Sequence, residues 1–369
     1  MGMASKNGKD LRLKADESIN SRLIIPHGNA LPITGTFLDE ISHDIPHQNW
    51  GEKEWDLDFR YMKAMGIDTV IDIRCGYRKF ITYPSPYLLK KGCYMPSTDM
   101  IDMFCRLAQK YGMKFWLGLY DSGKYWDTGD MSYEVEANKY VIDEIWQRYG
   151  SKYDSFGGWY ISGEISRATK GAIESFRTMG RQCKEVSGGL PTFISPWIDG
   201  KKAVDAAGGN LTKEQAVSIE QHEREWNEIF DGIHEYVDAC AFQDGHIDYD
   251  ELDAFFSVNK KLADRYGMQC WTNAESFDRD MPIRFLPIKF DKLRMKLSSS
   301  AGTGSSRSRS CRRSRRCRSR TGFRLSPPRW PGTLSGSYLC FCPSLIECQS
   351  IPCTCRRDVP PEGRPTEGS

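Results

Sequence analysis

Carboxylates that follow short apolar runs are the residues of this 369-residue chain most suited to chemistry. Glu164 ends the run GGWYISGE, and Glu275 ends MQCWTNAE. Two carboxyl groups that face each other can cleave an acetal, because one protonates the departing oxygen while the other attacks or activates water. Aromatic residues accompany these runs, and aromatic rings suit the C–H faces of sugars. The pattern predicts a carbohydrate site.

Glu164 and Glu275 are the predicted catalytic residues. The residues expected to line the sugar site all lie at or near the ends of apolar runs: Asp39, Glu40, Asp72, Arg74, Tyr120, Asp121, Trp197, Gln243, Asp244 and Trp271. Burial beside Trp159 or Trp271 would raise the pKa of the acid. A carboxylate at such a position can equally be the ion-pair partner of an arginine, and the candidate partners are Arg74, Arg167 and Arg279.

The elements that must position these residues alternate between β-rich apolar runs and longer amphipathic segments. The predicted strands span 33–41, 68–75, 114–121, 157–164, 192–198, 237–243 and 268–275, and the predicted helices 56–65, 98–111, 133–149, 171–186, 220–233 and 251–266. Gly66, Gly112 and Gly267 end three of the helices, as glycine often does. A (β/α)8 TIM barrel fits better than a Rossmann-like sheet, because the first βα turn reads LDEISHDIPH and has no G-x-G-x-x-G.

The predicted barrel lacks its eighth strand. After LRMKL at 293–297 the chain reads SSSAGTGSSRSRSCRRSRRCRSRTG, which has neither a helical nor a strand period. An open barrel of seven strands would leave two unpaired edges. We therefore expect a barrel of the glycoside-hydrolase type without an eighth strand, followed by a disordered Arg/Ser-rich tail.

The composition changes abruptly at that point. Residues 298–369 hold 13 Arg, no Lys and four acidic residues, whereas the preceding part is acidic overall. A GC-rich gene read in a shifted frame gives such a segment, and we treat a frameshift as one hypothesis. The other is a genuine Arg/Ser appendage that binds RNA phosphates. Seven Cys also crowd into the tail, but their spacing does not repeat C-x2-C and all six His lie elsewhere, which disfavours zinc.

Three segments are predicted: an N-terminal extension at 1–29, the barrel at 30–297 and the tail at 298–369. No apolar run approaches the roughly 18–20 residues of a spanning helix, and mean hydropathy is −0.55. The N-terminus also lacks the apolar core of a secretion signal. We therefore expect a cytoplasmic protein whose six scattered thiols, before the tail, stay reduced. The oligomeric state is left open.

Other motifs favour structure over chemistry. His43-x-x-x-His47 has metalloenzyme spacing, but Pro46 breaks any helix between the two rings. The acidic stretch 244–253 resembles a calcium loop but has Tyr249 where the turning Gly is needed, so Asp248 and Asp250 are interpreted as helix N-caps. The G-x-S-x-G signature of serine hydrolases is absent.

Five stretches together resemble a family of uncharacterised bacterial barrel proteins related to the retaining-clan glycoside hydrolases. They are ITGTFLDEISHDIPHQNW, IDTVIDIRCGYR, FGGWYISGEIS, AFQDG and CWTNAESFDRDMP, and the resemblance covers about residues 30–297. It implies that Glu164 is the acid/base and Glu275 the nucleophile. Gly163 stands where the clan has Asn, and the Arg/Ser tail replaces the eighth strand.

The leading hypothesis is a glycoside hydrolase that acts on a carbohydrate substrate without a metal or an organic cofactor. A non-catalytic glycan-binding barrel is the first alternative, and a nucleic-acid binder that acts through the Arg/Ser tail is the second. No membrane partner is expected. The sugar, its linkage and the stereochemical outcome depend on loop shapes that no motif encodes.

Overall fold

Seven short parallel strands alternate with helices along the chain, as predicted. The structure, a computed structural model, describes residues 33–41, 50–167, 169–202, 216–278, 286–303 and 336–341. The parallel strands are β1 (Gly35–Leu38), β2 (Thr69–Asp72), β5 (Lys114–Gly118), β7 (Phe156–Tyr160), β8 (Thr192–Ile194), β9 (Ala239–Gln243) and β10 (Gln269–Glu275). They lie side by side in chain order around a barrel.

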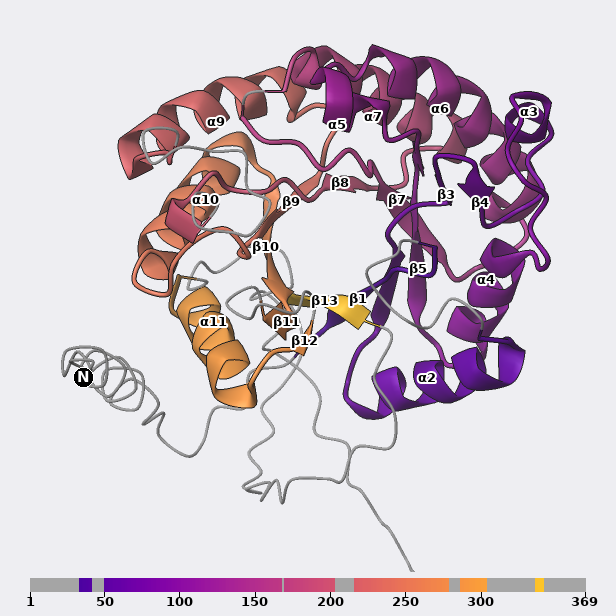
Figure 1. Cartoon of the computed structure of the whole chain (residues 1–369), viewed down its shortest axis with the longest axis horizontal. Helices are drawn as coiled ribbons and strands as arrows, with labels where there is room; N and C mark the ends of the chain where they lie inside the picture. The colour runs from indigo at the N-terminus through magenta and orange to yellow at the C-terminus, as the bar shows by residue number, and fades with distance from the viewer. Residues whose placement is uncertain are drawn as a thin grey trace, which may run out of the picture.

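A ring of helices surrounds the strands (Figure 1). Its members are α2 (Glu52–Ala64), α4 (Met100–Lys110), α6 (Ser132–Ile145), α7 (Ala172–Ser187), α9 (Ile219–Ile233), α10 (Leu252–Tyr266) and α11 (Phe290–Thr303). Two of these helices begin with a side-chain N-cap. Asp99 accepts from the Asp102 N–H at the start of α4, and Ser218 accepts from the Gln221 N–H at the start of α9. The predicted left-handed glycines are present, with φ of 94° at Gly66 and 70° at Gly267. No helix in the described ranges is long and apolar enough to span a membrane.

The gap between β10 and β1 is filled by a strand that runs in the opposite direction. Strand β13 (Gly336–Phe341) pairs antiparallel with both neighbours, so that Leu339 lies opposite Thr36 and Ala274. It closes the barrel, and Figure 1 shows it between β10 and β1. An eighth parallel strand is absent from the described residues. The unpaired N–H and C=O groups of two sheet edges explain why a segment with aromatic and apolar residues pairs there.

Part of the predicted disordered tail therefore has regular structure. Helix α11 continues through residues 298–303, beyond the predicted boundary at 297, and β13 lies wholly within the tail. Ser and Ala are compatible with the last turns of a helix, and strand β13 gains its hydrogen bonds from the two barrel edges. The predicted extension at 1–29 and the rest of the tail lie outside the described residues.

Two apolar layers hold the barrel, and strand alternation separates them. Phe37, Ile71, Phe193 and Ala241 point inward and form the interior cluster with Trp116 and Tyr160. Their neighbours along the strands, such as Leu38 and Val70, point outward against the helices in the larger cluster. The interior is thus a packed core, and an open site can form only at a mouth of the barrel.

Short elements rise above the C-terminal ends of the strands and shape that mouth. Strands β3 (Gly76–Tyr77), β4 (Phe80–Ile81) and β6 (Tyr120–Asp121) form one small sheet, and β11 (Phe277–Asp278) pairs with β12 (Leu286–Pro287) in another. Helices α3 (Pro86–Lys90) and α5 (Lys124–Thr128) accompany the first sheet, and a π-helical turn, η1 (Trp146–Gly150), ends α6.

Candidate active site

Glu164 follows β7 and lies beside an arginine at the barrel mouth. Arg74 Nη2 is 3.7 Å from Glu164 Oε1, and Arg74 Nη1 donates to Asp121 Oδ2 at 3.0 Å. Burial alone would lower the pKa of Arg74, but Glu164, Asp121 and Asp39 outweigh it and raise that pKa well above its usual value. A permanent positive charge therefore sits between the carboxylates of three different strand ends.

The loop after β6 fixes both Asp121 and Glu164. The Tyr125 hydroxyl accepts from the Glu164 N–H at 3.1 Å and lies 3.4 Å from Asp121 Oδ2. The Gly123 N–H donates to Asp121 Oδ1 at 2.7 Å. Burial raises the pKa of Asp121, although Arg74, this N–H and the Trp126 side chain all act in the opposite direction. Glu164 keeps 13% of its side chain exposed and can meet a ligand.

Gly163 stands at the position where the retaining clan carries an asparagine. A Cβ at this position would lie 2.3 Å from Met131 Cε, and the nearest further ring is that of Phe176, so a side chain here would displace the end of Met131. The position therefore faces the buried layer under α6 and α7. Glycine offers no side chain to a ligand at this position.

Glu275 ends β10 and is 1% exposed. Trp271 belongs to the interior cluster while Ala274 packs on Leu297 of α11, so alternation points Glu275 inward, toward the mouth. A Cβ on Gly245 would lie only 2.0 Å from Glu275 Oε2. The glycine after Asp244 thus allows the carboxylate to pack directly on the backbone.

Asp244 and Lys296 hold the main chain of Glu275. The Glu275 N–H donates to Asp244 Oδ1 at 3.0 Å, and Lys296 Nζ donates to the same oxygen at 2.8 Å and to the Glu275 carbonyl at 3.2 Å. Burial raises the pKa of Asp244, Lys296 counteracts it and Glu275 adds to it. Asp244 lies between the barrel and α11, so its role is to position Glu275.

Polar side chains fill the space between the two glutamates. Asn273 Nδ2 donates to Ser195 Oγ at 2.8 Å, and Gln243 Nε2 donates to the Ser195 carbonyl at 2.8 Å. Trp197 forms an isolated β-bridge with Gln243 through the backbone, and its side chain is half-buried. The centre of its ring lies 5.2 Å from that of His246. Gln243 and Trp197 both lie at the carboxyl ends of their strands, since Gln243 ends β9 and Trp197 follows β8.

Asp39 reaches the mouth, whereas Glu40 and Asp72 do not. Asp39 is two residues after the inward-facing Phe37 and contributes to the pKa of Arg74. Asp72 alternates with Ile71 and Ile73, which face the interior, so it points to the helix side. There it forms a fully buried pair with Glu40. Burial raises the pKa of Glu40, and it raises the pKa of Asp72 to about 8. The prediction that Glu40 and Asp72 line the sugar site did not take into account that neighbouring residues of a strand point to opposite sides of the sheet.

Three predicted aromatic residues also lie away from the mouth. Tyr120 packs against the β3–β4 hairpin and donates its hydroxyl to the Arg78 carbonyl at 2.6 Å. Trp271 lies four residues before Glu275, about 13 Å along the strand, and stacks edge-on with Trp116 inside the barrel. Trp159 faces outward and donates to Ser187 Oγ. Neither tryptophan can desolvate the acid as predicted.

Of the predicted arginine partners, Arg74 alone is seen beside a candidate glutamate. Arg167 pairs with Asp199 and Glu225 instead. Burial raises the pKa of Asp199 to about 6 despite this arginine. Arg279, His43 and His47 lie outside the described residues.

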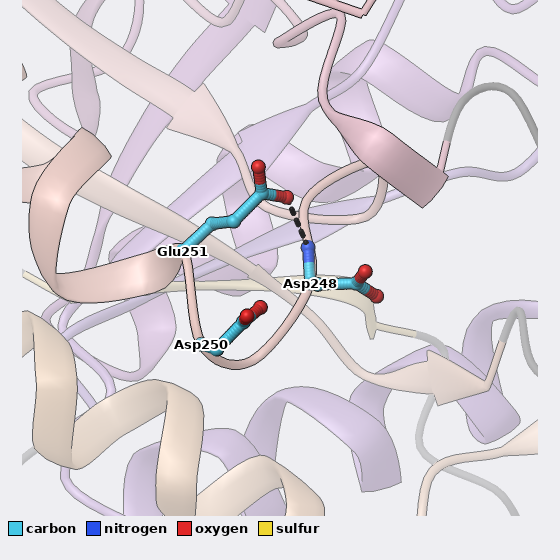
Figure 2. Close-up of side chains that lie close together, drawn as sticks. All are labelled: Asp248, Asp250 and Glu251. Carbon is cyan, nitrogen blue, oxygen red and sulfur yellow. Dashed lines mark hydrogen bonds between the residues drawn. The ribbon is translucent and has the colours of Figure 1, made fainter. Parts of the chain in front are cut away.

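A small acidic group lies on the loop before α10 (Figure 2). Asp248, Asp250 and Glu251 each offer a carboxylate oxygen within 4.8 Å of the others. Glu251 accepts from the Asp248 N–H at 3.0 Å, and Lys201 Nζ is 3.6 Å from Glu251 and 3.8 Å from Asp250. Glu251 is the N-terminal flanking residue of α10, so the interpretation of Asp248 and Asp250 as N-caps was wrong. The carboxylates of Asp248, Asp250 and Glu251 lie on one loop beside Lys201.

Sequence reasoning overlooked Tyr125, Lys296 and Asn273. Tyr125 and Lys296 are on helices, and the search considered only strand ends. Lys296 lies three residues after Leu293 and next to Leu297, the apolar residues of α11 that pack on the barrel, and this spacing is a signal that could have found it. Asn273 could have been found from its spacing, two residues before Glu275.

The fold is a closed barrel of the (β/α) type, with Glu164 and Glu275 at the carboxyl ends of two of its strands. The profile of a domain of unknown function, DUF4434, matches residues 33–308. The chain belongs to this family. No curated protein matches the sequence.

A solved structure has a similar sequence and fold. It is described as a "putative alpha-L-fucosidase" from Bacteroides thetaiotaomicron, with 77% identity over 77% of this chain and 86% of that one, at a TM-score of 0.72. A GH2 beta-galacturonidase from Eisenbergiella tayi shares 11% identity over 76% of this chain and 42% of that one, with a TM-score of 0.44. That second likeness is too distant to carry an argument.

Proposed function

We propose that this chain is a glycoside hydrolase that cleaves an O-glycosidic bond with Glu164 as the acid/base and Glu275 as the nucleophile. The observation that carries the proposal is the pair of glutamates at the carboxyl ends of the barrel strands, Glu164 four residues after β7 and Glu275 at the end of β10. These strands are three places apart around the barrel, so the two carboxylates approach the mouth from different sides. Each is held by its own network, Glu164 by Arg74 and Tyr125, and Glu275 by Asp244 and Lys296.

The reaction would proceed in two balanced steps. Glu275 attacks the anomeric carbon while Glu164 donates its proton to the departing oxygen, which leaves as an alcohol. Glu164 then takes a proton from water, and the resulting hydroxide displaces Glu275 from the sugar. Arg74, shared between Glu164 and Asp121, would stabilise the carboxylate form of Glu164 between these steps.

An α-L-fucoside is the first substrate to test, because the 77% identical relative is described as a "putative alpha-L-fucosidase". Asp39, Arg74, Asp121, Gln243 and Trp197 would contact the sugar. Neither a metal nor an organic cofactor is needed for this chemistry. A cytoplasmic location and the absence of a nucleic-acid partner remain predictions.

The test is hydrolysis of 4-nitrophenyl α-L-fucoside, followed by a panel of other aryl glycosides. We expect Glu164→Gln and Glu275→Gln each to lower kcat/KM by about 10²–10⁴-fold. Glu228→Gln, on the exposed face of α9, is the matched control and should keep full activity. Turnover that survives Glu275→Gln would contradict the proposal, and glycan binding without any turnover would favour the non-catalytic barrel.

Azide assigns the two roles. In Glu275→Ala, azide can replace the missing nucleophile, and the glycosyl azide product should have the anomeric configuration opposite to that of the substrate. In Glu164→Ala, azide should instead attack the glycosyl-enzyme intermediate, and the product should retain the configuration. The reverse pattern would exchange the roles of the two residues.

A further inference from the structure

An exposed tryptophan stands at the rim beside Glu164. Trp126, on α5, is 44% exposed, in a molecule whose large aromatic residues are mostly buried. Its side chain lies close enough to Asp121 to lower the pKa of that carboxyl, and Asp121 in turn binds Arg74, which lies beside Glu164. The centre of the neighbouring Tyr125 ring lies 4.9 Å from that of Trp126. The indole is thus next to Asp121 while much of its surface stays open to solvent.

An exposed arginine borders the same loop. Arg78 is the non-glycine residue with a left-handed backbone in the described ranges, with φ of 54°. Its N–H donates to the Asp121 carbonyl at 2.8 Å, and its side chain runs so close to Gly123 that a Cβ there would lie 2.9 Å from Arg78 Nε. Its guanidinium lies 5.3 Å from the centre of the Tyr77 ring. Strained backbone of this kind gathers at ligand sites.

Both residues are close to Asp121, Arg78 through its N–H on the Asp121 carbonyl and Trp126 through the effect of its side chain on the pKa of the Asp121 carboxyl, so they lie on the same side of the mouth. Sugar rings pack their C–H faces on indole, and a guanidinium donates to ring oxygens. The position of Trp126 relative to the two glutamates indicates whether it would contact the glycon or the leaving-group sugar. Trp126 is connected to Glu164 through Asp121 and Arg74, whereas Glu275 is held from the side of α11.

We propose that Trp126 and Arg78 form a subsite for the leaving-group sugar, with its ring stacked on Trp126 and an oxygen substituent bound by Arg78. The inference rests on the proposed function, in which Glu164 protonates the oxygen of the leaving group. The chain would therefore prefer glycosides whose aglycone is itself a pyranose. Binding energy from this remote ring would be used at the transition state.

Two substrates with the same glycon separate this subsite from the catalytic centre. Methyl α-L-fucoside has no leaving-group ring but its methanol needs the same protonation by Glu164, whereas fucosyl-α-1,2-galactose has a leaving-group ring. We expect Trp126→Ala to lower kcat/KM for the disaccharide by about tenfold or more and to leave that for the methyl fucoside within about twofold. Arg78→Met should act in the same direction, and Trp126→Phe should be milder because it keeps a ring. Tyr61→Ala, an exposed aromatic on α2, is the matched control.

Equal losses on both substrates would overturn the subsite, because Trp126 would then act only by supporting Asp121 and Glu164. Unchanged disaccharide hydrolysis would also overturn it while leaving the proposed function intact. If the wild-type protein hydrolyses no glycoside in the panel, then the proposed function fails and the subsite fails with it. The unfolding midpoint of each variant in urea shows whether a loss comes from misfolding.

Discussion

At the scale of the residue, buried charges carry the argument for a site. Arg74 brings one positive charge among the carboxylates of the mouth, Lys296 brings one between the barrel and α11, and both are almost fully buried. Removing one partner of a buried ion pair leaves an uncompensated charge, whereas removing both partners costs much less. This asymmetry allows their roles in folding and in catalysis to be measured separately.

Lys296→Met should show that asymmetry. The substitution keeps the length of the side chain but leaves Asp244 buried without its ammonium partner, so we expect a loss of about 3–5 kcal/mol in the free energy of unfolding. The double variant with Asp244→Asn should recover part of that loss. Urea unfolding of the wild type, both single variants and the double variant gives the coupling energy. Additive effects would show that the ion pair does not matter for stability.

Asp72 makes a separate prediction about pH. Its pKa is raised to about 8 in the folded protein, mainly by burial, from its ordinary value of 3.8. A raised carboxyl pKa means that the folded state binds the proton more tightly than the unfolded state does. The stabilisation of the folded state by protonated Asp72 is therefore complete below about pH 4 and is lost as pH rises to about 8. Asp72→Asn should therefore flatten the decrease in stability over this range. Unfolding curves at pH 5, 7 and 9 test this, and parallel slopes would contradict it.

At the scale of the element, the loops after the strands decide what each glutamate can touch. The turn from β9 carries Asp244 and Gly245, so one loop both binds the main chain of Glu275 and leaves space for its carboxylate. After β6, the Tyr125 hydroxyl at the start of α5 likewise binds the main chain of Glu164. A small change in either loop should therefore alter catalysis more than folding.

Gly245→Ala tests this for Glu275. Gly245 does not have a positive φ, so alanine brings no backbone strain, but its Cβ would overlap the Glu275 carboxylate. That carboxylate has to move, and we expect kcat to fall at least about 100-fold with KM and the urea midpoint nearly unchanged. Kinetics on the best substrate of the panel provide the measurement. A variant with normal kcat would show that the carboxylate position tolerates displacement.

At the scale of the whole molecule, the closure of the barrel depends on a strand from the Arg/Ser tail. Strand β13 covers one edge of β1 and one edge of β10, and β10 carries Glu275. The family match ends at residue 308, so this strand lies outside the part shared with the family. The shift of reading frame remains a hypothesis, and sequencing the gene across the codons for residues 292–320 would test it.

Two truncations that differ by six residues test the role of β13. A chain that ends at Phe341 keeps the strand, whereas one that ends at residue 335 leaves both edges unpaired. We expect the shorter chain to unfold at lower urea and to aggregate, because exposed edges pair with other chains. Light scattering and urea unfolding compare the two. Equal stability would show that β13 contributes nothing to the barrel.

The sequence by itself determined the alternation of strands and helices, their order and the two glutamates as candidates. These follow from local periodicity and from residue type, which the chain carries wherever it folds. The tertiary structure alone decided which strand-end residues share the mouth. Asp72 and Glu40 turn to the helix side, Trp271 lies too deep, and Lys296 arrives from a helix. The tertiary structure also decided the direction of β13, because strand pairing depends on which sheet edges are open in space.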